Sequence, residues 1–217
     1  MSRQFKRVQK KFLIGLLLVI SSLSISTTLA YVHQTPPYTG SYHGGGAYFG
    51  SWYAAAYTSG YLYGYVSTSP TAYGWASANA YVWDEFIFNE GSPWGCFIKL
   101  KLSLSFYAKA DTMGDYASVT VSVKLYELSD LLIWNVVWSG TAYSKSVVGG
   151  SVTVKQIKTI ILNPTCPVFY AHAYRIEVQY STYCTSGWTG ASFVQFSSTS
   201  TNPSFCYVYY MDMYCAV

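Results

Sequence analysis

A strict alternation of apolar and polar side chains between Phe97 and Ala110 constrains the fold of this chain more than any other feature of its sequence. Over this stretch, FIKLKLSLSFYAKA, every second side chain from Leu100 to Ala108 is apolar, and lysine, serine or tyrosine stands between them. A period of two places the apolar side chains on one face of an extended strand. The pattern therefore predicts a β-sheet with one dry and one wet face.

The next segment, residues 116–128, repeats this alternation, with valine or leucine at positions 119, 121, 123 and 125. Only the short turn-forming stretch DTMGD separates the two segments, so we expect them to form a β-hairpin. In the segment 151–162 the parity of the apolar residues changes between Val154 and Ile157, which predicts a β-bulge near Lys155.

Further strands are predicted for residues 131–138, 141–147, 168–178, 190–197 and 205–214, with turn-forming residues between them. Helical periodicity is nearly missing beyond the first thirty residues. Many short strands without helices are typical of two packed antiparallel sheets. The predicted fold is all-β, an antiparallel β-sandwich resembling a jelly roll.

The stretch from Ser41 to Ser67 consists almost entirely of tyrosine, glycine, serine and alanine, and no charged residue occurs between Tyr31 and Trp83. Tyrosine favours pleated surfaces because it combines apolar area with a polar tip. We therefore expect folded sheet from Ala47 onward. Residues 31–46, which contain two adjacent prolines and three adjacent glycines, are predicted to be a flexible N-terminal arm that could add a strand to a neighbouring subunit.

Residues 1–30 have the pattern of a signal peptide, with a helical apolar core from Phe12 to Ile20. Small residues at Thr28 and Ala30 suit cleavage after Ala30, and the alternative is that this segment is retained as a membrane anchor. The expected organisation is a signal peptide at 1–30, an arm at 31–46 and one β-sandwich domain at 47–217. The protein is therefore predicted to be secreted and extracellular, at the cell surface.

Cleavage would also change the charge of the chain. Five of the 13 basic residues lie in the leader, so eight would remain against nine acidic residues. A nucleic-acid partner is not expected, because no basic stripe remains to neutralise phosphates. A surface with so few charges also lacks the repulsion that keeps proteins apart, so self-association is a natural expectation.

The exported part contains five cysteines: Cys96, Cys166, Cys184, Cys206 and Cys215. In an oxidising compartment they predict two intrachain disulfides and one remaining thiol. Their spacing leaves the connectivity open. Because there is no Cys-x-x-Cys pair, a zinc site is not expected.

Sequence signatures of a nucleophile, a phosphate-binding loop, a dinucleotide site or a metal site are missing, so no cofactor is expected. Glycoside hydrolysis needs two carboxyl groups, and the candidates for it are Glu90 and Glu177, each of which could equally be a solvated or ion-paired acid. His172 falls on the apolar parity of its predicted strand and is expected to be a core histidine with one hydrogen bond.

These features favour a non-catalytic structural protein of the cell surface that associates with itself or with envelope components, as a filament, sheath or adhesive subunit. In composition and strand pattern the chain resembles the extracellular β-rich subunits of archaeal threads and bundling pili. The alternatives are a secreted antimicrobial protein or toxin, in the manner of archaeal sulfolobicins, and a secreted glycoside hydrolase or carbohydrate-binding module. A membrane contact is expected only through an uncleaved leader.

Overall fold

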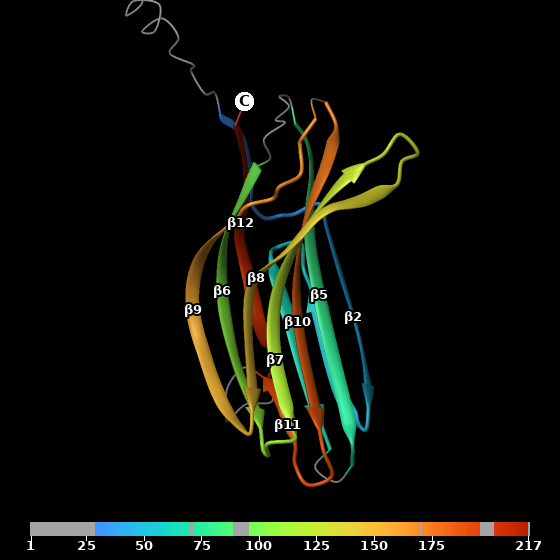
Figure 1. The fold of residues 1–217 in the computed structure, drawn as a ribbon, viewed down its shortest axis with the longest axis vertical. Coiled ribbons are helices and arrows are strands. Elements are labelled where there is room, and N and C mark those ends of the chain that lie inside the picture. Colours follow the sequence, from blue (N-terminus) through green and yellow to red (C-terminus); the bar gives the residue numbers. More distant parts are fainter. Residues whose placement is uncertain (1–28, 70–71, 89–95, 170, 196–201, 217) are drawn as a thin grey trace, which may run out of the picture.

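The computed structural model describes residues 29–69, 72–88, 96–169, 171–195 and 202–216, which form two antiparallel β-sheets (Figure 1). Sheet A contains β1 (Leu29–Gln34), β3 (Gly50–Ala56), β4 (Tyr61–Thr68), β6 (Cys96–Ala110), β9 (Gly150–Leu162), β11 (Ser192–Gln195) and β12 (Ser204–Ala216). Sheet B has the order β2-β5-β10-β7-β8, formed by β2 (Gly40–Tyr48), β5 (Gly74–Ile87), β10 (Ala173–Ser186), β7 (Tyr116–Leu128) and β8 (Trp134–Val148). The predicted antiparallel β-sandwich of jelly-roll type is confirmed. The predicted signal peptide helix, up to residue 28, lies outside the described residues.

The core lies between the two sheets. Every side chain that the alternation of β6 placed on the dry face, from Leu100 to Ala108, is buried, and so are those of β7 from Val119 to Leu125. Burying alternate side chains of two facing sheets removes apolar area from water and drives the folding of a sandwich. The apolar faces that the alternation predicted for these two strands are therefore the faces that form the core.

The predicted hairpin of β6 and β7 is wrong. β6 pairs with β9, β11 and β12 in sheet A, whereas β7 pairs with β8 and β10 in sheet B. The turn at residues 111–115 therefore crosses from one sheet to the other. The physical reason is that both strands carry a long apolar face, and placing them in opposite sheets buries the two faces against the same core.

The predicted flexible arm at residues 31–46 is replaced by two ordered strands. β1 pairs with β12 from Leu29 to Gln34, and β2 pairs with β5 from Gly40 to Tyr48. The backbone donors and acceptors of the glycine run that face β5 are therefore paired within the sheet, which offsets part of the entropy that ordering glycine costs. The predicted strand addition therefore takes place within the chain, because β1 adds to the edge of sheet A beside β12 and β2 adds to the edge of sheet B beside β5.

Strand β9 contains no bulge, since it pairs with β6 in unbroken register from Gly150 to Leu162. The change of parity instead turns Ile157 and Ile161 to the outer face of sheet A, where each is 60% exposed. An edge strand tolerates this because few neighbours cover it. Lys158 occupies the inward parity, with its ammonium 5.1 Å from the centroid of the Tyr143 ring. An inward lysine on an edge strand opposes pairing with another chain.

The expectation of a core position for His172 is also wrong. Strand β10 begins at Ala173, so His172 precedes the alternating segment and is exposed. Its Nδ1 lies 2.7 Å from Oε1 of Glu127 on β7. The single hydrogen-bonded partner was expected, and the burial was not.

One disulfide, Cys96–Cys215, joins the start of β6 to the end of β12, where the sequence predicted two disulfides. Cys166, Cys184 and Cys206 are free thiols. Cys184 and Cys206 both face the core but belong to opposite sheets, which lie about 10 Å apart, beyond the reach of a disulfide. The Cys96–Cys215 bond is typical of proteins in an oxidising compartment. In the described ranges no helix is long and apolar enough to cross a membrane.

The three thiols should differ in reactivity. Burial raises the pKa of the Cys184 thiol to about 12 and also raises the pKa of the fully buried Cys206 thiol. Because the thiolate is the nucleophile, iodoacetamide at neutral pH should modify half-buried Cys166 first. Mass spectrometry of the native protein should show one modified cysteine, and three after unfolding without reductant. Rapid labelling of Cys184 in the native protein would contradict this.

Candidate carbohydrate-binding face

The outer face of sheet B carries exposed aromatic rings and two hollows, which make it the candidate binding site. The register of β2, β5 and β10 places outward side chains of the three strands in rows across the sheet. One row joins Tyr48, Trp75 and Thr185, and another joins Tyr42, Tyr81 and Gln179. Aromatic rings on β2 and β5 therefore lie beside uncharged polar groups on β10, on a surface that the other sheet does not cover.

One hollow on this face, here called the glycine hollow, has a volume of about 360 Å³. Tyr42 and Tyr81 stand at one end, with ring centroids 5.8 Å apart, and Trp75 stands at the other. Its remaining lining residues are Gly44, Gly45, Gly46, Ser77 and Asn79. The hollow exists because the middle of β2 has no side chains between the rings of its neighbours.

Close approach of two tryptophans explains the glycines at positions 45 and 46. A Cβ at Gly45 would lie 2.5 Å from the ring of Trp52 and 2.4 Å from the carbonyl oxygen of Ser77. A Cβ at Gly46 would lie 3.1 Å from the ring of Trp75. At Gly44, by contrast, the nearest atom would be the Tyr42 hydroxyl at 3.4 Å, an ordinary contact. This position could accept a side chain that fills the hollow without disturbing the strand.

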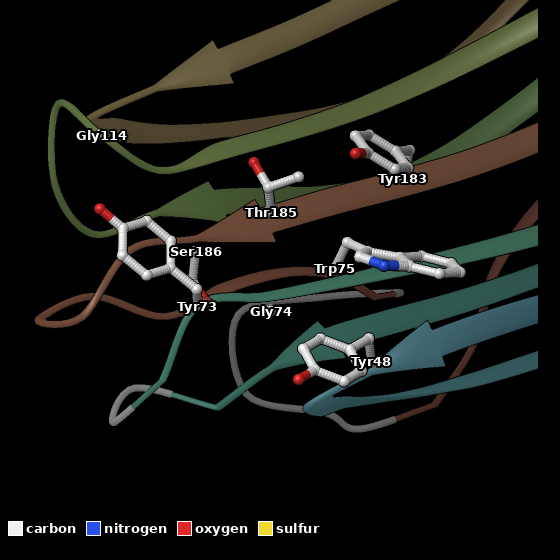
Figure 2. A pocket seen from close by; sticks show the side chains of 8 residues that line it. All are labelled: Tyr48, Tyr73, Gly74, Trp75, Gly114, Tyr183, Thr185 and Ser186. Carbon is white, nitrogen blue, oxygen red and sulfur yellow. The ribbon is translucent and has the colours of Figure 1, made fainter.

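The second hollow, here called the tyrosine hollow, has a volume of about 410 Å³ and shares Trp75 with the first. Figure 2 shows Trp75 on β5 between Tyr183 on β10 and Tyr48 on β2, whereas Tyr73 lies nearer the loops, beside Ser186. Gly114, from the turn between β6 and β7, and Ser186, at the end of β10, complete this end of the face. Trp188 packs edge-on against Tyr73, with ring centroids 5.3 Å apart.

Hydrogen bonds orient the polar groups in and beside the glycine hollow. The Gln179 side-chain nitrogen donates to Oδ1 of Asn79 at 3.1 Å and to Oγ of Ser181 at 2.8 Å. Because the oxygen of Asn79 is engaged, its amide nitrogen is the group that a ligand hydroxyl would meet. The arrangement offers an oriented donor between two aromatic walls.

The two sequence candidates for acid catalysis do not come together. Glu90 lies outside the described residues. Glu177, on β10, lies on the outer face with its side chain only 13% exposed. Its Oε1 accepts a hydrogen bond of 3.0 Å from the Tyr126 hydroxyl and lies 3.7 Å from the Lys124 ammonium. Burial, together with the charge and the hydrogen bond of Glu177, raises the pKa of Tyr126 to about 12, so this hydroxyl stays a donor at neutral pH.

The acid nearest to Glu177 on this face is held in a different ion pair. Glu85, diagonal to Glu177 across β5 and β10, accepts two hydrogen bonds from Arg175, at 2.6 and 3.1 Å. The guanidinium also lies 4.4 Å from the ring centroid of Trp134 and 5.3 Å from that of Trp83. Stacking and pairing together fix Arg175 and Glu85 in one geometry.

The described residues that line the two hollows include no charged side chain. Elsewhere in the described part of the chain, no group of three or more histidine, cysteine, aspartate or glutamate residues is placed to hold a metal ion. The face therefore offers stacking surfaces and neutral hydrogen-bonding groups. Ligands that match such a surface are uncharged and carry both apolar faces and hydroxyls.

Comparison with known proteins gives similarity of fold alone. No family model and no curated protein matches the chain. A loop-swap mutant of Xyn11A from Necallimastix patriciarum is 8% identical with a TM-score of 0.34, over 84% of this chain and 100% of that one. A carbohydrate-binding module of family 29 is 13% identical with a TM-score of 0.21, over 83% and 88%. The CBM22-1–GH10 modules of Clostridium thermocellum Xyn10B, complexed with xylohexaose, are 16% identical with a TM-score of 0.26, over 81% and 28%.

Sequence reasoning missed both hollows. Trp75, Tyr42 and Tyr183 are each unremarkable tyrosine or tryptophan residues of an aromatic-rich chain. They line neighbouring hollows on one face only because β5 lies between β2 and β10 in the sheet. The signal that the sequence does contain is the run of three glycines in a stretch that otherwise reads as strand, since glycine within a strand marks a close approach of a ring, a ligand or another backbone.

Proposed function

We propose that this protein is an exported carbohydrate-binding protein of the cell surface, which holds a neutral polysaccharide across the outer face of sheet B. The observation that carries the proposal is the pair of adjacent hollows that share Trp75 and are lined by aromatic rings and uncharged polar groups. The apolar faces of sugar rings pack on aromatic rings, while their hydroxyls need hydrogen-bonding partners. The cell-surface location rests on the disulfide and on the leader pattern.

The length of the site favours a polymer over a single sugar. Trp75 and Tyr81 both point outward from β5, six residues apart, which corresponds to about 20 Å along the strand. The tyrosine hollow extends this surface beyond Trp75. Several sugar units in a row would therefore be in contact with the face.

The placement of the acids favours binding over hydrolysis. Glycosidases need two carboxyl groups that flank the bond to be broken. Glu177 is engaged with Tyr126 and Lys124, and Glu85 is engaged with Arg175. Neither carboxylate lines a hollow. The proposed role is therefore non-catalytic, and Glu177 supports the surface beside Tyr81.

Replacing Trp75 with alanine should weaken binding to a neutral polysaccharide by about 30-fold or more, because a central aromatic anchor contributes about 2 kcal/mol. Affinity electrophoresis in gels containing β-glucan, xylan or mannan, followed by calorimetry with the best ligand, would measure the loss. A Gly44→Leu variant should weaken binding as strongly, because it fills the glycine hollow without removing a ring, and its Cβ would make only ordinary contacts with Tyr42.

The matched control is Tyr53→Ala, which removes a ring of similar exposure (47% against 42% for Trp75) from sheet A. This variant should bind as the unmodified protein does. Full binding by both Trp75→Ala and Gly44→Leu would contradict the proposal, and so would retention by an acidic polymer such as alginate but by none of the neutral polymers.

Two predictions from the sequence stay predictions. Self-association as a filament or adhesive subunit is compatible with glycan binding, and four tyrosines exposed around the outer face of sheet A, Tyr31, Tyr53, Tyr57 and Tyr61, are the surface that would favour it. An antimicrobial role rests on the sequence alone.

A further inference from the structure

The tip of the hairpin between β7 and β8 exposes three consecutive large apolar side chains. Leu131 is 80% exposed, Leu132 79% and Ile133 56%. Turns between strands normally carry glycine, asparagine, aspartate or serine, and runs of exposed apolar residues are selected against unless they have a function. Among the described residues, no other run of three consecutive large apolar side chains is exposed, so this tip needs an explanation.

The conformation of the tip makes the choice of leucine more telling. Leu132 has a φ of 59°, in the left-handed region that glycine and asparagine adopt with less strain. The turn is nevertheless closed by two backbone hydrogen bonds: the Ser129 nitrogen donates to Ile133 O at 3.0 Å, and the Leu132 nitrogen donates to Ser129 O at 2.9 Å. A strained residue held by a closed turn presents its side chain to the outside in a fixed direction.

Other apolar side chains lie at the same end of sheet B. Ile87, at the end of β5, is exposed, and so are Phe169, just before β10, and Val136 on β8. The charged groups nearby are paired, Arg175 with Glu85 and His172 with Glu127, and Asp130 adds one negative charge at the tip. This end of the molecule is therefore apolar and has no excess of positive charge.

The position of the N-terminus indicates what this end faces. Figure 1 shows the β7–β8 hairpin leaning away from the body at the end where β1 begins and β12 ends. Leu29 pairs with Ala216 there, and the apolar segment from Phe12 to Ile20 precedes it in the chain. A chain still joined to a membrane-inserted leader would have the bilayer at this end of the sandwich.

We propose that the tip, Leu131 to Ile133, inserts into the apolar layer of a lipid bilayer and that Ile87 and Phe169 contact the same membrane. Burial of apolar side chains drives this contact, so it needs neither anionic lipid nor low salt. The residues that line the two hollows lie on β2, β5 and β10, next to the start of β5 and in the turn before β7, and none of them belongs to the tip, so the hollows stay open to a polysaccharide outside the membrane.

Insertion is tested by a fluorescent reporter on the tip, which responds to the bilayer whether or not the leader is retained. A Cys166→Ser background removes the accessible thiol, and Leu132→Cys carries an NBD label. On addition of phosphatidylcholine vesicles, the NBD emission should shift to the blue and increase at least twofold. The same label at Ile157→Cys, on the outer face of sheet A, should not respond.

Partitioning is tested by flotation of the exported protein with phosphatidylcholine vesicles. The triple variant Leu131→Ser, Leu132→Asn and Ile133→Thr should partition about 100-fold more weakly, as expected for removing about two buried leucine equivalents. The matched control, Ile157→Ser with Ile161→Ser, removes side chains of similar exposure and should partition normally. Because asparagine suits the positive φ at position 132, the triple variant should melt no lower than the unmodified protein.

An unchanged NBD spectrum on the tip would overturn the proposal. A second copy of the chain would be the partner of the tip, and the proposal would be wrong, if two results came together. The triple variant would lose self-association in sedimentation, and the NBD label at position 132 would not respond to vesicles. Binding that appears only with phosphatidylglycerol and vanishes in high salt would overturn the proposed mechanism, since it would be electrostatic.

Discussion

Replacing both Cys96 and Cys215 with alanine should lower the free energy of unfolding by about 5 kcal/mol. The disulfide closes a loop with a sequence separation of 119 residues, and in the chain-entropy model the loss grows with loop length. It joins Cys96, the first residue of β6, to Cys215 on β12, and Cys215 lies opposite Ala30 of β1 on the other side of β12. Without the disulfide, this end of sheet A is held by backbone pairing and by the stacking of the Tyr214 ring on Phe97 and Tyr31. Guanidinium unfolding at equilibrium would measure the difference.

The controls separate the cross-link from the side chains. Reduced native protein should unfold at the same denaturant concentration as the double variant, and reductant should not affect the double variant. Cys166→Ala, which removes a free thiol, should leave the unfolding midpoint unchanged. A decrease in the free energy of unfolding of less than about 1 kcal/mol would contradict this explanation, because the disulfide would then not act by restricting the unfolded chain.

Asp115→Ala should cost about 3 kcal/mol of stability, because hydrogen bonds to a charged acceptor contribute about 1.5–3 kcal/mol each when their loss leaves a buried donor unpaired. Asp115 is buried and accepts from the Thr112 nitrogen at 2.9 Å and from the Gly187 nitrogen at 2.8 Å. It therefore ties the turn between β6 and β7 to the loop after β10.

The same substitution should weaken glycan binding, because Gly114 and Ser186 on these two segments line the tyrosine hollow. Asp115→Asn is the matched control: it keeps the shape and one acceptor oxygen and should lose about half as much stability. Urea unfolding and hydrogen exchange at Gly187 would report both changes. An alanine variant as stable as the original, with Gly187 still protected, would show that other contacts hold the two segments together.

The dry faces of the strands could be read from the sequence because they depend on a local period. Leu102 and Val121 had to point the same way as their neighbours two residues along, whatever the strand paired with. The tyrosine-rich stretch after Ala47 likewise forms β3, β4 and β5 as expected. The sequence predicted that disulfides form but not which cysteines they join, because the spacing of the cysteines does not specify which strand ends lie close together.

Strand partners could not be read in the same way. β6 and β7 are neighbours in sequence with a turn between them, yet they lie in different sheets. Residues 31–46 look flexible as an isolated stretch, because glycine and proline form no local structure of their own. They are ordered by β5 and β12, which the chain reaches only 30 to 180 residues later.

The alternation of apolar and polar side chains was enough to predict an all-β sandwich, because it is a property of residues close together in the chain. The glycine and tyrosine hollows, the pairing of Glu85 with Arg175 and the exposed tip at Leu132 arose only on folding. They depend on which strands lie side by side, and that choice is made by burying all the apolar faces at once.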